Sequence, residues 1–336
     1  MQIAARGIPI HTRTLSVTLL GGDGAELELA AYVLDLRKRG FVPVAGDLQG
    51  TGIIHHMQLA GAIDRRAQRL TRLTARMPTV AFEASAATQG ESCRDLVARV
   101  DALAGTTLDK GYPRRLSEEI GGPRGCSHVL TLAQLVGPTA TWALREDGRL
   151  HGSDAPRRRG ERVFRRDVVV DGYESDGDLW LTLQLNDLCF APEVDATAAS
   201  ERFAAQLELR GAARVAMSEL RIAELALEER RRDARSFDTA EWRPRPDRAE
   251  PVVGLSLRAG ITAALLDQFG GQGGAGDDQP LLDALLMLAP ATVQCVASFI
   301  DTWTKVPWMR GNETGGFPDS CYMWRRDGAL GRTRFV

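Results

Sequence analysis

The sequence predicts an α+β fold in which a unit of four antiparallel strands followed by three helices occurs twice in tandem. Three observations lead to this prediction. Alternating apolar residues early in the chain give way to helical spacing, the same succession restarts after residue 161, and a chain of 336 residues has room for two such units. With 44% hydrophobic and 26% charged residues, the composition is typical of a globular protein.

The first predicted unit, residues 1–148, contains all of these elements in order. Its first two strands lie on either side of Gly21-Gly22-Asp23-Gly24, a sequence typical of a hairpin turn. A polar loop from Gly40 to Gly52 separates this hairpin from two further strands, and three segments with helical spacing follow. The predicted strands are Thr12–Leu20, Glu26–Leu36, a strand entered at Ile53–Leu59 and Gln68–Phe82, and the predicted helices are Ser92–Leu103, Gly111–Ile120 and Ser127–Leu144.

The second predicted unit, residues 162–300, follows a charged linker at 149–161 and repeats these patterns in the same order. Asp187 ends a strand as Asp35 does in the first unit, but the second unit contains no histidine. We interpret the chain as a pseudo-dimer with two-fold symmetry, in which a degenerate second copy has lost its site. The other matched segments are Asp176-Gly177 with Asp23-Gly24, Gly260–Gly271 with Gly111–Gly122, and Leu281–Phe299 (with Pro290) with Val129–Leu144 (with Pro138).

The tail, residues 301–336, belongs to neither unit and is rich in aromatic residues, among them Trp303 and Trp308. Buried aromatic side chains remove large apolar areas from water, so we expect the tail to pack on the first unit. It either closes a pocket with Asp319 and Cys321 or only covers an apolar patch.

Histidines and cysteines gather at three places in the first unit, at the start of a strand and at the starts of two helices. Thiolate sulfur and imidazole nitrogen bind zinc, and iron accepts similar ligands. The glycine-rich turn 121–125 is expected to aim the next residues inward, and a helix N-terminus favours the thiolate form of Cys126. The predicted metal ligands are His55, Cys93, Cys126 and His128, with His56, Asp319 and Cys321 as catalytic candidates.

Other interpretations of these residues remain open. His55 or His56 can be an exposed strand-end histidine, Cys93 can be a buried packing residue, and a cysteine with a histidine can form a nucleophile and its base. No paired Cys-x₂-Cys occurs, so any metal site has to be assembled by the fold.

The first unit contains a His-Thr-Arg segment near its start, then an Ile-His-x-Met strand, a cysteine before a helix, and a Gly-Gly-x-x-Gly-Cys-x-His stretch. In these motifs the chain resembles the bacterial family of unknown function numbered 2889. His56 stands where that family has an aspartate, and residues from about 150 to 300 have no counterpart. The family implies no activity. The motifs are His11–Arg13, Ile54–Met57, Cys93 before Leu103-Ala104-Gly105, Gly121–Val129, and Asp319–Cys321 with Arg325–Gly328.

The order of elements is also similar to that of the NifU-like iron–sulfur cluster scaffold proteins, which implies a related fold. In this chain, the positions comparable to the cluster ligands of those proteins are occupied by His55-His56, Cys93 and the Cys126/His128 pair. Histidine in place of a cysteine makes a mononuclear zinc or iron ion a better fit than a cluster.

Composition and motifs narrow the functional classes. The net charge of −2 and the absence of an apolar run of about 18 residues predict no binding to nucleic acid or membranes. Five cysteines and no signal sequence predict a cytoplasmic protein without disulfides. Phosphate-loop, dinucleotide-binding and serine-hydrolase motifs are absent. We therefore expect a metal-dependent enzyme acting on a small molecule near the cleft between the copies, or alternatively a metal or iron–sulfur carrier, or a structural partner protein.

Overall fold

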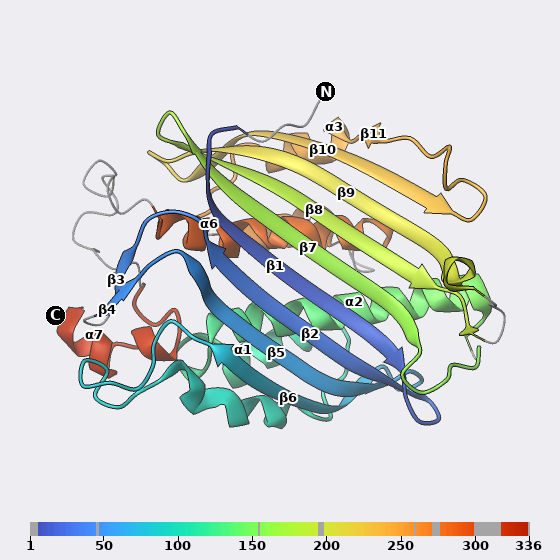
Figure 1. Cartoon of the computed structure of the whole chain (residues 1–336), viewed down its shortest axis with the longest axis horizontal. Coiled ribbons are helices and arrows are strands. Elements are labelled where there is room, and N and C mark those ends of the chain that lie inside the picture. Colours follow the sequence, from blue (N-terminus) through green and yellow to red (C-terminus); the bar gives the residue numbers. More distant parts are fainter. Residues whose placement is uncertain are drawn as a thin grey trace.

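A computed structural model describes residues 6–44, 47–153, 155–193, 198–258, 260–270, 276–298 and 317–334. Among these residues, nine strands form one antiparallel sheet in the order β11-β10-β9-β8-β7-β1-β2-β5-β6. The helices lie on one face of this sheet, and α2 crosses it diagonally (Figure 1). The predicted α+β class, an antiparallel sheet with helices on one face, is therefore confirmed.

The first half supplies four adjacent strands of this sheet, joined in sequence order. The predicted polar loop contains two short strands of its own, β3 (Val42–Val44) and β4 (Asp47–Gln49), which pair with each other. The strands of the main sheet are β1 (Ile8–Gly21), β2 (Glu26–Arg37), β5 (Gly52–Asp64) and β6 (Arg69–Thr79).

Three helical segments of the first half follow β6. The run of 3₁₀ turns η1 (Cys93–Leu103) begins with a capping box, in which Ser92 and Asp95 satisfy each other's backbone amides. It is followed by α1 (Tyr112–Ile120), the short η2 (Gly122–Arg124) and the long helix α2 (Ser127–His151). Because α2 continues to His151, the first three residues of the predicted linker are helical.

The second half adds four long strands and a short edge strand, again followed by helices. Its strands are β7 (Arg162–Ser175), β8 (Asp178–Phe190), β9 (Phe203–Ala216), β10 (Arg221–Asp233) and β11 (Arg243–Pro244). Its helical segments are η4 (Ala199–Arg202), α3 (Pro246–Ala249), η5 (Glu250–Val252), α4 (Ile261–Phe269), η6 (Gly276–Asp278), α5 (Gln279–Leu286) and α6 (Leu288–Val296).

The two halves meet where β1 pairs with β7, at the centre of the sheet. Leu15 pairs with Val168 at the middle of this contact. Two residues away on one side Arg13 lies opposite Val170, and two residues away on the other side Arg166 lies opposite Val17. The connections from strands to helices also correspond. Leu70 N–H donates to the Thr106 carbonyl in the first half, and Ile222 N–H donates to the Leu255 carbonyl in the second.

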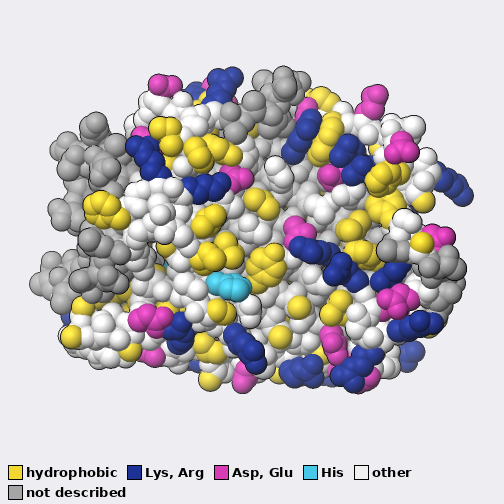
Figure 2. All heavy atoms as spheres, viewed as in Figure 1, with side chains coloured by type: hydrophobic (Ala, Val, Ile, Leu, Met, Phe, Trp, Pro, Cys, Tyr) yellow, Lys and Arg dark blue, Asp and Glu magenta, His cyan; other side chains and the backbone are white. Residues whose placement is uncertain are grey.

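Alternate residues of each strand point to opposite faces of the sheet. The helix-covered face carries the core, including Leu15, Val33 and Val168, none of which is exposed. On the opposite face, shown in Figure 2, hydrophobic and charged side chains are interspersed. His56 belongs to this second face, where its ring meets Tyr32 edge-on at 6.3 Å.

The described part of the tail, residues 317–334, packs on the first half. It contains η9 (Tyr322–Trp324) and α7 (Ala329–Arg334). Trp324 meets Phe82 edge-on at 5.3 Å, and Arg325 forms an ion pair with Glu91. The predicted packing of this part is thus observed, whereas Trp303 and Trp308 lie outside the described residues.

One helical run, Gly276–Val296, is long and apolar enough to cross a membrane, but 67% of its apolar 18-residue stretch is buried inside the protein. Its apolar residues contact the sheet and α2. Its apolar composition is therefore explained by its position in the core.

Candidate metal centre

Three neighbouring strands align a row of polar side chains on the helix-covered face. In the strand register, Arg13 of β1 pairs with Asp35 of β2, and Asp35 pairs with His55 of β5. All three are buried, with exposed fractions of 1%, 0% and 7%. A row of charge in the core costs free energy unless the groups satisfy one another or a ligand.

The turn before α2 brings a second histidine to this row. Gly125 packs so closely on the preceding helix that a Cβ there would lie 1.9 Å from the Ile120 carbonyl oxygen. The backbone then enters α2 with Cys126 as N-cap, which places His128 on the first turn of the helix. The prediction that this glycine turn aims His128 inward agrees with the structure.

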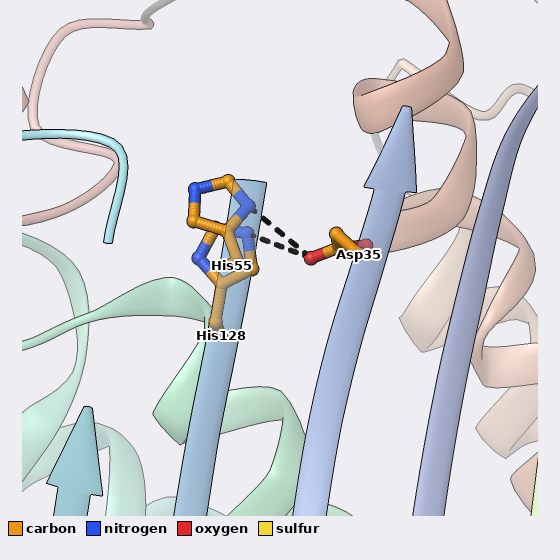
Figure 3. Close-up of side chains that lie close together, drawn as sticks. All are labelled: Asp35, His55 and His128. Atoms are coloured by element: carbon orange, nitrogen blue, oxygen red, sulfur yellow. Dashed lines mark ion pairs between the residues drawn. The ribbon is translucent and has the colours of Figure 1, made fainter. Parts of the chain in front are cut away.

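Asp35, His55 and His128 converge on one point (Figure 3). His55 Nδ1 lies 3.3 Å and His128 Nε2 lies 3.4 Å from the same carboxylate oxygen of Asp35. The two imidazole rings face each other, with centroids 3.8 Å apart. One ligand atom from each of the three residues falls within 4.8 Å of the other two, so they form a group able to hold a metal ion.

The charges around Asp35 keep it ionised. Burial by itself would raise the pKa of Asp35, but Arg13 and then the neighbouring histidines hold it well below its usual range. Burial, and next the His55 ring, hold the pKa of His128 well below its usual range. Burial likewise lowers the pKa of His11, which lies 3.7 Å from Asp35, to about 4. The site at neutral pH therefore combines a carboxylate with neutral imidazoles at His11 and His128.

Several buried nitrogens on these three strands, including the end of β2, have no hydrogen-bond partner within the described part of the chain. They are both ring nitrogens of His11, His55 Nδ1, and the Nε atoms of Arg13 and Arg37. Most buried polar atoms in proteins are hydrogen-bonded, and an unpaired one costs about 1–3 kcal/mol. These unpaired nitrogens make this part of the core costly to bury.

The site opens into a pocket of about 310 Å³ between the first half, α6 and the tail. From α6, Gln294 places its amide nitrogen 3.2 Å from His128 Nε2, so the second half reaches the site directly. The polar wall includes Arg13, Arg37, Gln49, His55, His128 and Gln294, and the apolar wall includes Ile54, Phe82, Val293, Phe317, Met323 and Trp324.

The predicted cysteine ligands line this pocket but lie outside the group of ligand atoms formed by Asp35, His55 and His128. Cys126 Sγ lies 3.7 Å from His128 Nδ1, on the side of the ring away from Asp35. Burial raises the pKa of Cys126 and raises that of Cys93 well above its usual range. The expected thiolate at the helix start is therefore wrong in direction, because burial outweighs the helix N-terminus.

The three catalytic candidates have different environments. Cys321 lines the pocket, and burial raises the pKa of its thiol to about 11. Asp319 closes a turn of the tail by accepting a hydrogen bond from the Arg326 backbone at 3.0 Å, and it does not line the pocket. His56 lies on the opposite face of the sheet from the site. Of the three, the structure brings only Cys321 to the site.

Sequence reasoning missed four residues of this site: His11, Arg13, Asp35 and Arg37. Two signals for them existed. His11 and Arg13 belong to the first motif of the family that the sequence resembles, and Asp35 was matched to Asp187 as the end of an equivalent strand. An aspartate on the buried side of an alternating strand needs a partner, and that argument leads directly to Arg13.

Residues 11–143 match a family model described as "Protein of unknown function (DUF2889)". This match supports the resemblance seen in the motifs, over a span that includes His11, Asp35, His55 and His128. The matched span ends before the second half and the tail, which supply Gln294 and Cys321. No curated protein and no solved structure matches the chain.

Proposed function

We propose that the first half holds one divalent metal ion, zinc or iron, on Asp35, His55 and His128, and that the protein is a metal-dependent enzyme acting on a small molecule in the adjoining pocket. Two histidines and one carboxylate on one side of an ion leave other coordination positions open, as catalytic sites require. The proposal depends most on one observation, the spacing of the three ligand atoms.

That spacing suits a metal better than hydrogen bonding. The contacts of 3.3 and 3.4 Å to Asp35 exceed the roughly 2.7–2.9 Å of a charge-assisted N–H···O bond. Two atoms that each lie about 2.0–2.1 Å from a tetrahedral ion are about 3.3–3.4 Å apart. Both histidine nitrogens thus already lie at ligand separation from the Asp35 oxygen.

The equivalent positions of the second half support a functional rather than a structural role. Arg166 pairs with Asp187 across β7 and β8, as Arg13 pairs with Asp35. Phe164 precedes Arg166 by two residues, where the first half has His11, and Leu207 pairs with Asp187, where the first half has His55. Since apolar residues fill the same positions in the second half, the fold itself does not need the histidines.

A bound divalent ion would act as a Lewis acid or lower the pKa of a water molecule. The chain's own groups prepare for this role. His128 turns Nε2 toward Asp35 and Nδ1 toward Cys126, so the thiol orients the ring from behind, as second-shell partners of metal ligands do. Phe82, Met323 and Trp324 keep the pocket largely apolar and restrict water.

We also propose that the two halves arose by tandem duplication and pack as a pseudo-dimer. The matched register at β1 and β7, the matched strand-to-helix hydrogen bonds and the equivalent Arg–Asp pairs support this origin. Under this proposal the second copy lost its histidines and contributes Gln294 to the remaining site.

The metal content of the purified protein tests the proposal. We expect about one equivalent of zinc or iron in the wild-type protein and in His56→Ala, and little in His55→Ala. The two histidines are adjacent on β5 but face opposite sides of the sheet, so His56→Ala is a matched control. Equal metal in both variants, or none in the wild type after growth with zinc or iron, contradicts the metal site.

The alternative proposal, an iron–sulfur or metal carrier, draws support from the three thiols in the same pocket, Cys93, Cys126 and Cys321. It predicts a brown protein with acid-labile sulfide after anaerobic purification. Loss of metal in a Cys93→Ser, Cys321→Ser double variant, with retention in His55→Ala, favours this carrier over the enzyme.

A further inference from the structure

Arg37 is a second feature of the pocket that metal binding leaves unexplained. It is the last residue of β2, two residues beyond Asp35, and it is only 3% exposed although it lines the pocket. Its Nη1 atom donates to the Gln49 carbonyl at 2.8 Å, while its Nε has no partner in the residues described. No carboxylate of those residues forms an ion pair with it. A buried guanidinium without a counter-charge is costly, and among the described residues Arg37 has none, so an anion bound in the pocket would supply one.

The second half again shows what the fold needs at this position. Two residues beyond Asp187, the equivalent place on β8 holds Cys189, a small buried residue. A guanidinium there is therefore unnecessary for packing. In the first half, Arg37 faces the same pocket as Asp35's neighbours His55 and His128.

We propose that Arg37 binds the carboxylate of a small, largely apolar carboxylic acid, and that such acids are the substrate class of the pocket. This inference builds on the proposed function, since it names what the metal site acts on. Guanidinium groups bind carboxylates through paired hydrogen bonds, and the start of α2 at Ser127 adds a dipole that favours an anion.

The size and polarity of the pocket restrict the rest of the proposed ligand. A volume of about 310 Å³ is at the small end of ligand pockets, and Phe82, Val293, Met323 and Trp324 offer apolar contact. Arg13 is already opposed by Asp35, so Arg37 is the one buried guanidinium of the described pocket wall without a carboxylate partner. One positive charge matches a single carboxylate better than a phosphate dianion.

Binding of paired probes to the protein stripped of metal with a chelator tests this assignment. The probes are benzoate, phenylacetate and isovalerate, each compared with its uncharged amide and with inorganic phosphate by titration calorimetry. We expect at least one acid to bind about tenfold or more tightly than its amide and than phosphate, as a charged hydrogen bond requires. Arg37→Met should lower the affinity for that acid to the affinity for its amide and leave the affinity for the amide unchanged.

Arg39→Met is the matched control, because Arg39 is two residues away, exposed, and paired with Glu174. It should leave acid binding unchanged, and Arg37→Lys should retain part of it. Equal binding of every acid and its amide, tighter binding of phosphate, or acid binding that survives Arg37→Met would overturn the assignment. Since the assay contains no metal, its result is independent of whether the metal site exists.

Discussion

Two arginine–aspartate pairs occupy the same register in the two halves, yet their surroundings differ. In the second half, Arg166 donates from Nε and Nη2 to both oxygens of Asp187 at 2.6 Å, and Asp283 of α5 and Thr139 of α2 accept from Nη1. In the first half, Arg13 lies 3.5 Å from both oxygens of Asp35.

The difference shows how one framework supports two roles. Around Arg166 the helices close over the pair and each polar group is satisfied, so the cluster rigidifies the core. Around Asp35 histidines replace apolar residues, hydrogen bonds are left unmade, and a pocket opens. A loss of stability through unmade hydrogen bonds and imperfect packing is typical of functional sites.

The largest effect should come from removing the two arginines separately. Arg166→Met leaves two carboxylates buried without their counter-ion and should lower the free energy of unfolding by about 3–5 kcal/mol. Arg13→Met breaks longer contacts and leaves one buried carboxylate, which His55 and His128 still contact, so it should cost less, about 1–2 kcal/mol. Chemical denaturation measures both values. We call the residues around Arg166 (Asp187, Asp283 and Thr139) the closed cluster and those around Asp35 (Arg13, His55 and His128) the open cluster. If Arg13→Met lowers the free energy of unfolding more than Arg166→Met, this distinction is wrong.

The closed cluster should also make stability depend on pH. Burial, opposed by Arg166, raises the pKa of Asp283 to about 7. The folded protein then holds this proton more tightly than the unfolded chain, so its contribution is complete below about pH 4 and is lost as the pH rises through 7. Asp283→Asn stays neutral and keeps an acceptor for Arg166. The difference in free energy of unfolding between this variant and the wild type should therefore increase in favour of the variant as the pH rises from 4 to 7. The increase should be at most about 1.4 kcal/mol per pH unit. A difference that stays constant with pH would refute the raised pKa.

Giving the open cluster the residues of the closed one should stabilise it. His55→Leu introduces the residue found at Leu207, and His11→Phe introduces that of Phe164. Each replaces an unsatisfied buried ring with apolar packing, and we expect a gain of about 1 kcal/mol in thermal or chemical unfolding. His55→Leu should also lose metal. Destabilisation by both changes would mean that these histidines are structural.

The smallest effect concerns the contact between the halves. The Gln294 amide occupies the side of His128 Nε2 that a metal would use, so Gln294→Ala removes a competitor. We expect zinc affinity to rise by up to about tenfold, the scale of other outer-shell changes. As a control, Gln279→Ala removes an amide that donates to Asp283 next to Arg166 and should leave zinc affinity unchanged. A fall in zinc affinity in Gln294→Ala would instead identify this residue as a ligand.

Much of the fold followed from local patterns, whereas the site followed only in part. Alternation and glycine turns located the long strands, and Pro138 inside α2 did not prevent the helix from being recognised. His55 and His128 were chosen because they stand at element starts. Asp35 and Arg13 escaped notice because their partnership depends on strand register, which a single sequence specifies weakly. The protonation of the cysteines was also out of reach, since helix position alone does not reveal the burial that raises their pKa.

Anomalous diffraction from crystals grown with zinc would locate the proposed ion itself. We expect one strong peak about 2.0–2.2 Å from Asp35, from His55 Nδ1 and from His128 Nε2. A peak on Cys93 or Cys321 instead, or no peak near Asp35, would contradict it.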